Sequence, residues 1–270
     1  MTKSKSDHIR EKVRERYAGI AAGGKGGCGC STASCCSTKA LPAKAQSAKL
    51  GYSKTELEAV PEGANMGLGC GNPQAIAMLR KGEVVLDLGA GGGFDCFLAA
   101  RQVGSRGRVI GVDMTPEMVA KARENARKGR FKNVEFRLGE IEHLPVADSS
   151  VDVILSNCVI NLSPDKKQVY REAFRVLKPG GRLAISDVVA VKPIPAALRQ
   201  DFDKHSGCVA GALQVRRLEQ ILRAVGFLDG RVMVKEASRE YIRDWFPGSG
   251  VEQYVRSADV QGMKPGRKSR

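Results

Sequence analysis

The sequence contains no long run of apolar residues. The longest one, around VDVILSNCVINL at 151–162, is interrupted by polar residues and is shorter than the roughly 20 residues that a membrane-spanning helix needs. The first residues, MTKSKSDHIREKVRERY, are charged and lack the apolar segment of a signal peptide or a membrane anchor. We therefore expect no membrane segment and a cytoplasmic location.

The central part of the chain carries little net charge. Residues 1–54 contain eleven Lys or Arg and three Asp or Glu, and residues 264–270 contain four Lys or Arg and no acid, so these flanks account for +12 of the total +15. A nucleic-acid surface needs a basic stripe across a folded face, whereas charge confined to the flanks is typical of solvated tails. We favour solvated tails, with nucleic-acid binding through them as the weaker alternative.

The N-terminal part also lacks the bulky side chains that build a core. The stretch AAGGKGGCGCSTASCC within residues 21–50 is rich in Gly, Ser and Ala, and a regular texture begins only near Leu50. No internal repeat is present, and the length fits one catalytic domain with flanking segments. The predicted parts are a flexible basic, cysteine-bearing segment, a folded core, a C-terminal part that completes the substrate site, and a basic tail: 1–50, 51–190, 191–263 and 264–270.

Beyond Leu50, strand-like and helix-like segments alternate. The predicted strands are 84–89, 108–113, 134–139, 151–157 and 182–189. The predicted helices are 73–81, 94–103, 116–128, 163–177 and 216–227, with a further helical stretch near 196–212 and late strands at 230–238 and 252–263. This order predicts an α/β fold with a doubly wound, mostly parallel sheet, helices on both faces and an antiparallel late strand.

A glycine-rich turn follows the first predicted strand. Asp87-Leu-Gly89-Ala-Gly91-Gly-Gly93 lies between that strand and a helix, where a doubly wound sheet binds its ligand and where glycines let the backbone approach closely. Alone, this turn fits a dinucleotide as well as S-adenosylmethionine. An acidic residue before the first glycine, and Asp113 at the end of the second strand as an acceptor for ribose hydroxyls, favour S-adenosylmethionine.

The same run resembles the first motif of class I S-adenosylmethionine-dependent methyltransferases. Two later landmarks follow in order, Gly139-Glu140-Ile141 after the third strand and VLKPGGRLAISD before the fifth. The resemblance implies a Rossmann-like methyltransferase fold with S-adenosylmethionine as cofactor. It assigns cofactor binding to Asp87, Gly89, Gly91, Asp113, Met114, Glu140, Ile141 and Asn157.

The resemblance also implies a role for most of these residues. Gly89 and Gly91 pass against the methionine portion, Met114 packs on the adenine face, and Asn157 lies beside the sulfonium. Asp87 faces the ammonium group of the cofactor, and the 139–141 loop lines the adenine.

The cysteines indicate the substrate. Nucleic-acid amino methyltransferases carry Asn/Asp-Pro-Pro-aromatic after the fourth strand, but this chain has Cys158 there. Cys70 precedes the first strand and Cys208 follows the fifth, and all three positions border the cleft of a doubly wound sheet. Thiols stay reduced in the cytoplasm, and three thiolates suit a soft trivalent ion. Arsenic(III) bound to sulfur keeps a lone pair that can attack a sulfonium methyl, so no general base is needed.

The runs GLGCGNP, SNCVINLSPDK and REAFRVLKPGGRLAISDVV resemble arsenite methyltransferases over roughly residues 50–230. This resemblance implies that Cys158 and Cys208 are arsenic ligands and that Cys70 is the third ligand or part of a thiol relay. The family also uses an N-terminal cysteine, for which four residues compete, with the Cys35-Cys36 pair as the better candidate: Cys28, Cys30, Cys35 and Cys36. The implied partners are a thiol reductant, thioredoxin or glutathione, and the implied state is a monomer active in arsenic detoxification.

Plainer interpretations compete with these. A free cysteine is often a core residue, and we interpret Cys96 in FDCFLAA in this way. His205 and Cys208 have the spacing of half a zinc site but lack a second pair. A methyltransferase for a small carbon or oxygen nucleophile, such as a quinone, would not need the thiols, and a non-catalytic arsenic-binding protein would not need the cofactor. The number of methyl groups added, and the acceptance of antimony or selenium, stay open.

Overall fold

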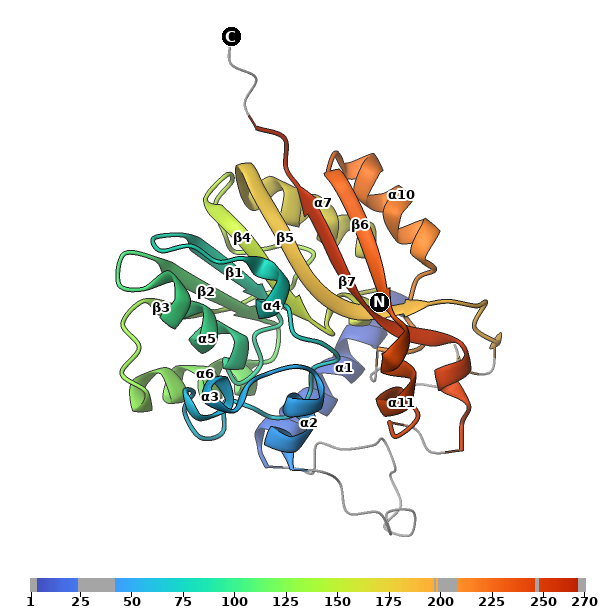
Figure 1. The fold of residues 1–270 in the computed structure, drawn as a ribbon, viewed down its shortest axis with the longest axis horizontal. Helices are drawn as coiled ribbons and strands as arrows, with labels where there is room; N and C mark the ends of the chain where they lie inside the picture. Colours follow the sequence, from blue (N-terminus) through green and yellow to red (C-terminus); the bar gives the residue numbers. More distant parts are fainter. Residues whose placement is uncertain (1–3, 24–41, 197, 199–207, 246–247, 267–270) are drawn as a thin grey trace.

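The computed structural model describes residues 4–23, 42–196, 198, 208–245 and 248–266, and within them a single mixed sheet has the order β3-β2-β1-β4-β5-β7-β6 (Figure 1). Its strands are β1 Val84–Leu88, β2 Arg108–Asp113, β3 Val134–Leu138, β4 Val151–Asn157, β5 Leu177–Ala190, β6 Leu228–Lys235 and β7 Val255–Met263. The first five strands pair in parallel, and β7 is antiparallel to both β5 and β6. The predicted mostly parallel sheet with an antiparallel late strand is confirmed.

Helices cover both faces of the sheet. They are α1 Lys5–Ala21, α2 Ala43–Lys49, α3 Lys54–Glu58, α4 Gln74–Ala77, α5 Phe94–Val103, α6 Pro116–Lys128, α7 Lys166–Val176, α10 Val215–Val225 and α11 Arg239–Ile242, with short 3-10 turns at Ile160–Leu162, Glu236–Ser238 and Val251–Gln253. Residues of α5 and α6 share one hydrophobic cluster, and residues of α7 and α10 share another.

The central strands are apolar on both faces because both are covered. In β1, Val85 packs into the cluster of α5 and α6, while its neighbour Leu86 packs into the cluster of α7 and α10. Successive strand residues point to opposite faces, so an unbroken apolar run is needed to fill two layers. This packing fixes the carboxyl ends of β1, β2 and β4 at one edge, where the site lies.

The helix predicted over 73–81 is shorter than expected. It ends at Ala77, and Met78 adopts a left-handed conformation (φ 47°) with its side chain 76% exposed. The Arg182 guanidinium of β5 donates to the backbone carbonyls of Ala77 and Met78, at 2.8 Å each. The helix therefore stops because a distant side chain satisfies its final carbonyl groups.

The N-terminal segment also differs from the prediction. Residues 5–21 form α1, whose Val13 is 1% exposed within the cluster that holds Cys70, Cys158 and Cys208. In Figure 1 this helix passes beneath the ends of the central strands. Residues 5–21 are therefore an ordered helix within the segment predicted to be flexible, because apolar side chains such as Val13 are buried in this cluster although most of their neighbours in sequence are charged. The boundary of that segment at residue 50 stays a prediction.

Two expectations after β5 have different outcomes. The helical stretch near 196–212 falls mainly outside the described residues, and Cys208 itself lies in a turn. The late strands appear as β6 and β7, shifted by two or three residues at their starts. Among the helices of the described segments, none combines the length and the apolarity needed to cross a membrane.

Candidate functional site

A cavity opens at the carboxyl ends of β1, β2 and β4, with an empty volume of about 1120 Å³. Seven of the eight residues predicted to bind the cofactor line it: Asp87, Gly89, Gly91, Asp113, Met114, Ile141 and Asn157. Parallel sheets bind ligands at this edge, and an apolar pocket with a few convergent polar groups is a usual binding site.

The glycine turn after β1 has the backbone that such a site requires. Gly89 has φ 69°, and a Cβ there would collide with the side chain of Val159. Gly91 has φ 51°, and a Cβ there would meet nothing within 4 Å. Only glycine adopts these angles without strain, so the turn leaves its backbone free to contact a ligand in the cavity.

Asp113 ends β2 with its carboxylate tied to the turn. One oxygen accepts from Gly91 N at 2.9 Å and the other from Thr115 N at 2.9 Å. Burial raises the pKa of this carboxyl, and the two backbone donors oppose that shift. Each oxygen keeps a second lone pair, so the carboxylate can still accept hydroxyl groups of a ribose.

Two further carboxylates, those of Asp87 and Asp95, also line the cavity. Cys96 Sγ donates to Asp87 Oδ2 at 3.1 Å, and Asp95 accepts from Tyr52 Oη at 2.8 Å and from Asn157 Nδ2 at 3.3 Å. Burial raises the pKa of both carboxyls, and for Asp87 the charge of Asp95 adds to the effect. Two buried acids side by side favour a cationic group between them. Cys96 belongs to the core, as predicted, and it also supports Asp87.

Glu140 is the one predicted cofactor residue that does not line the cavity. Its carboxylate instead pairs with Arg10 and Arg14 of α1, with N–O distances of 3.4 and 3.6 Å. Glu142, two residues later, takes its place in the lining and accepts from Ser163 Oγ at 2.7 Å. The loop turns Glu140 outward because α1 brings two guanidinium groups to that side, and the sequence gives no sign of this long-range contact.

The three predicted substrate thiols lie in one cluster beside the cavity. Cys70, Cys158 and Cys208 are 0%, 6% and 2% exposed and share one cluster. The neighbouring thiols of Cys208 and Cys70, together with burial, raise the pKa of Cys158. The Sγ atoms of Cys70 and Cys158 lie within 4.8 Å of each other. Burial raises the pKa of Cys70 to about 11. Of the three thiols, only Cys158 lines the cofactor cavity.

Two of these cysteines have an unusual backbone. Cys158 has φ 61° and Cys208 has φ 66°, in the left-handed region that non-glycine residues rarely adopt. The Cys208 thiol donates to the Cys158 carbonyl at 2.7 Å, and Cys158 N donates to Ser186 O at 2.8 Å. Strain of this kind persists where the surrounding structure fixes it, and it clusters at functional sites.

Cys70 is held from two sides. Its backbone N–H donates to Asn157 Oδ1 at 3.0 Å, and its carbonyl accepts from Tyr241 Oη at 3.0 Å and from Ser257 Oγ at 2.7 Å. Asn157 therefore connects the loop before β1 to the end of β4, where the cofactor cavity and the thiols meet.

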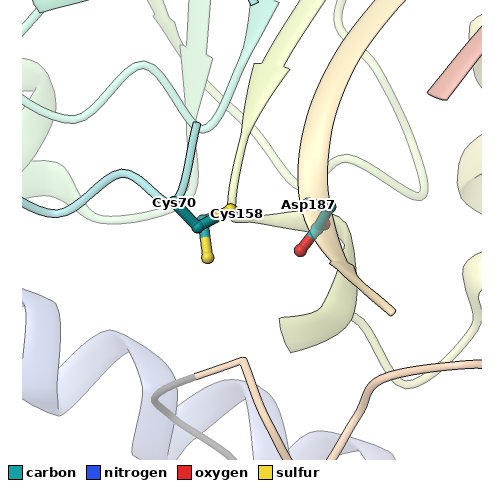
Figure 2. A group of neighbouring side chains, drawn as sticks. All are labelled: Cys70, Cys158 and Asp187. Carbon is teal, nitrogen blue, oxygen red and sulfur yellow. The ribbon is translucent and has the colours of Figure 1, made fainter. Parts of the chain in front are cut away.

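Asp187 of β5 is a site residue that the sequence analysis missed. Ligand atoms of Cys70, Cys158 and Asp187 all lie within 4.8 Å of one another, and Figure 2 shows Cys70 on a loop, Cys158 just after β4 and Asp187 on β5. Burial raises the pKa of Asp187 to about 6. Its position in the run LAISD, at the carboxyl edge of a parallel strand, was the available signal.

Helix α1 covers both the cofactor cavity and the cluster of the three thiols. Val13 and Tyr17 line the cofactor cavity and also belong to the cluster around the thiols. Burial, together with the nearby thiols of Cys208 and Cys158, raises the pKa of Tyr17. The predicted N-terminal relay cysteines and His205 lie outside the described residues.

Comparisons with known proteins agree with this geometry. A family model described as a methyltransferase domain matches residues 79–226. An arsenite methyltransferase of Halobacterium salinarum is 51% identical over 97% of this chain and 68% of its own length, and one of Aquipseudomonas alcaligenes is 44% identical over 75% of this chain and 58% of its own length. This chain thus spans about two thirds of the first relative and less of the second.

A solved structure adds a similar fold. It is an arsenic(III) S-adenosylmethionine methyltransferase from Chlamydomonas reinhardtii, 34% identical, with a TM-score of 0.62 over 86% of this chain and 76% of that one.

Proposed function

The chain belongs to the arsenite methyltransferases, and we propose that it transfers a methyl group to trivalent arsenic held by the thiolates of Cys70, Cys158 and Cys208. S-adenosylmethionine is the cofactor, and the cavity offers it the backbone of Gly89 and Gly91 and the carboxylates of Asp87 and Asp113.

One observation carries the proposal. Cys158 lines the cofactor cavity, its Sγ lies within 4.8 Å of that of Cys70, and its carbonyl accepts from the Cys208 thiol at 2.7 Å. An atom bound by the three sulfurs would therefore lie next to the cavity in which the methyl donor binds. Holding the two reactants next to each other lowers the activation barrier of methyl transfer without an acid or a base.

The empty site suits arsenite as it arrives in water. Burial raises the pKa of Cys70, and the neighbouring thiols together with burial raise that of Cys158, so these two sulfurs carry their protons before arsenite binds. Neutral As(OH)₃ exchanges its three hydroxyl groups for three thiols, each thiol proton leaves with one hydroxyl as water, and no net charge is buried. The product keeps the arsenic lone pair.

When bound, S-adenosylmethionine supplies an electrophilic methyl group. The arsenic lone pair would form the As–C bond, and the electrons of the broken S–C bond would stay on the cofactor sulfur. The chain contributes positioning. Asn157 fixes the loop of Cys70 relative to the end of β4, and Gly89 together with Val159 sets the wall between cofactor and thiols. Val13 and Tyr17 of α1 cover this junction and exclude water.

A reduction completes the cycle. Methylation removes two electrons from arsenic, and two thiols return them by forming a disulfide, which a thiol reductant, thioredoxin or glutathione, then reduces. Cys35 or Cys36 is our candidate for the relay thiol that joins this step. Such a cycle needs a reducing compartment, which supports a cytoplasmic role in arsenic detoxification.

Arsenic speciation tests the proposal. Purified protein with arsenite, S-adenosylmethionine and a thiol reductant should yield methylated arsenic, and Cys158→Ser should not. If the wild-type protein yields none but binds the cofactor, a small carbon or oxygen nucleophile such as a quinone becomes the better substrate. Arsenite binding without cofactor affinity in calorimetry would indicate a non-catalytic arsenic-binding protein.

A further inference from the structure

The arsenic site includes a carboxylate that arsenic chemistry does not need. Ligand atoms of Cys70, Cys158 and Asp187 lie within 4.8 Å of one another, and all three side chains are buried (Figure 2). Trivalent arsenic with three thiolates is already complete, because its fourth position holds the lone pair that attacks the methyl group. A hard oxygen ligand beside two thiols instead matches the mixed sulfur and oxygen set that zinc accepts.

We propose that Cys70, Cys158 and Asp187 form a binding site for zinc or a similar borderline-soft divalent cation, which competes with arsenite for the two thiolates. Zinc prefers four tetrahedral ligands, so Cys208 or a water molecule fills the fourth position. On binding, the protons of the two thiols pass to solvent and two Zn–S bonds and one Zn–O bond form, with no change of oxidation state.

Hydrogen bonds hold the Asp187 carboxylate in an orientation that suits a metal ligand. Oδ1 accepts from Asn161 Nδ2 at 2.9 Å and from Val188 N at 2.7 Å, and Oδ2 accepts a longer bond from Asn161 N at 3.3 Å. The first oxygen is thus anchored and the second has lone pairs to spare. Hydrogen bonds of this kind orient the carboxylate ligands of metal sites.

The charge balance also favours a divalent cation. With water as the fourth ligand, two thiolates, one carboxylate and Zn²⁺ sum to −1, and the ammonium group of the partly buried Lys166 is attracted to Asp187 and Cys208. Lys166 Nζ donates to Ser163 O at 2.9 Å, which holds it beside the cluster. The loaded site would then be close to neutral, as a buried site must be.

The consequence is a block on the proposed reaction. A cation bound by Cys70 and Cys158 removes two of the three sulfurs that arsenic needs and leaves no lone pair toward the cofactor. Competition with arsenite rests on the proposed function, whereas cation binding itself does not.

Cobalt is a suitable probe, because tetrahedral Co²⁺ has visible bands and thiolate ligands add a charge-transfer band. The full chain with Cys28, Cys30, Cys35 and Cys36 changed to Ser keeps the N-terminal thiols from binding metal. We expect one Co²⁺ per chain with thiolate charge transfer, displaced by Zn²⁺ and by arsenite. Asp187→Asn should weaken Co²⁺ and Zn²⁺ by at least about tenfold while arsenite binding changes less than about twofold.

Asp259→Asn is the matched control, because Asp259 is a buried aspartate on the neighbouring strand that accepts from Ser186 Oγ at 2.9 Å but is not part of the cluster. It should leave metal affinity unchanged. Circular dichroism and S-adenosylmethionine binding establish that each variant folds. If Asp187→Asn does not fold, Cys70→Ser replaces it and should reduce the charge-transfer band.

Absence of bound Co²⁺, or equal affinity in Asp187→Asn and the parent, overturns the proposal. An undiminished charge-transfer band in Cys70→Ser also overturns it. If Co²⁺ binds as expected but arsenite does not displace it, the cation site stands and the proposed arsenic site fails.

Discussion

The cofactor half and the thiol half of the site are built in different ways. The cofactor half comes mainly from one continuous unit, the strand, glycine turn and acidic strand end of residues 84–113. The thiol half brings together Cys70, Cys158, Asp187 and Cys208 from positions spread over almost 140 residues, and α1 covers it. A local motif positions the first half, whereas the whole fold positions the second.

This difference predicts which substitutions should affect each half of the site. The Asp113 carboxylate at the end of β2 is held by hydrogen bonds from neighbouring backbone groups. The effect of removing it should therefore stay within the cofactor half. The thiols depend on contacts between distant segments, with Asn157 as the connection. Variants in each half should therefore separate cofactor binding from arsenic binding, and a variant at the connection should affect both.

Cys158→Ser should have the largest effect. We expect methylation of arsenic to fall by at least about 10²-fold, because arsenic without this ligand is misplaced from the methyl donor. S-adenosylmethionine affinity should change less than about twofold by calorimetry, since a hydroxyl keeps the wall of the cavity. A comparable loss of cofactor affinity would show that the two halves are not separable.

Asp113→Ala is the corresponding test in the cofactor half. Removing a carboxylate that accepts charge-assisted hydrogen bonds should weaken cofactor binding by about 10- to 100-fold, which corresponds to about 1.5–3 kcal/mol. Arsenite binding, measured as arsenic retained per chain after gel filtration, should be unchanged. Lost arsenite binding would contradict the separation.

Asn157→Ala should affect both halves. It removes the hydrogen bonds that Asn157 makes with Cys70 N and Gly71 O, and one of the hydrogen bonds that the Asp95 carboxylate accepts. We expect a loss of about 1–3 kcal/mol in the free energy of unfolding and weaker binding of both ligands, measured by urea denaturation and calorimetry. Asn133→Ala, which removes bonds to Ala100 O and Gly104 O, is the control and should reduce stability alone.

Arg10→Ala should have the smallest effect. Its guanidinium pairs with Glu140 and Glu142 and ties α1 to the cofactor side. The partly exposed pairs contribute about 0.2–1 kcal/mol, so we expect the KM for S-adenosylmethionine to rise no more than about fivefold. Lys12→Ala, which breaks an exposed pair with Glu15 inside α1, should leave KM unchanged. Equal KM values for the two variants would argue against a role for this attachment.

The same comparison explains what the sequence could predict. Local patterns were sufficient to predict the strands of the mostly parallel sheet and to place Gly89, Gly91 and Asp113 where they line the cavity, because strand periodicity and turn chemistry act over a few residues. They were not sufficient for the early end of α4, where Arg182 captures the carbonyls of Ala77 and Met78. The outward turn of Glu140 toward Arg10 and the approach of Asp187 to Cys70 likewise depend on contacts between residues more than 100 positions apart.

The central claim is that Cys158 belongs to both halves of the site, and X-ray absorption at the arsenic edge tests it most directly. The spectrum of the full chain loaded with arsenite, with the N-terminal cysteines at 28, 30, 35 and 36 changed to Ser, should show arsenic bound to three sulfur atoms. With Cys158→Ser added, one sulfur should be replaced by oxygen. Three sulfur ligands in both proteins would contradict the account.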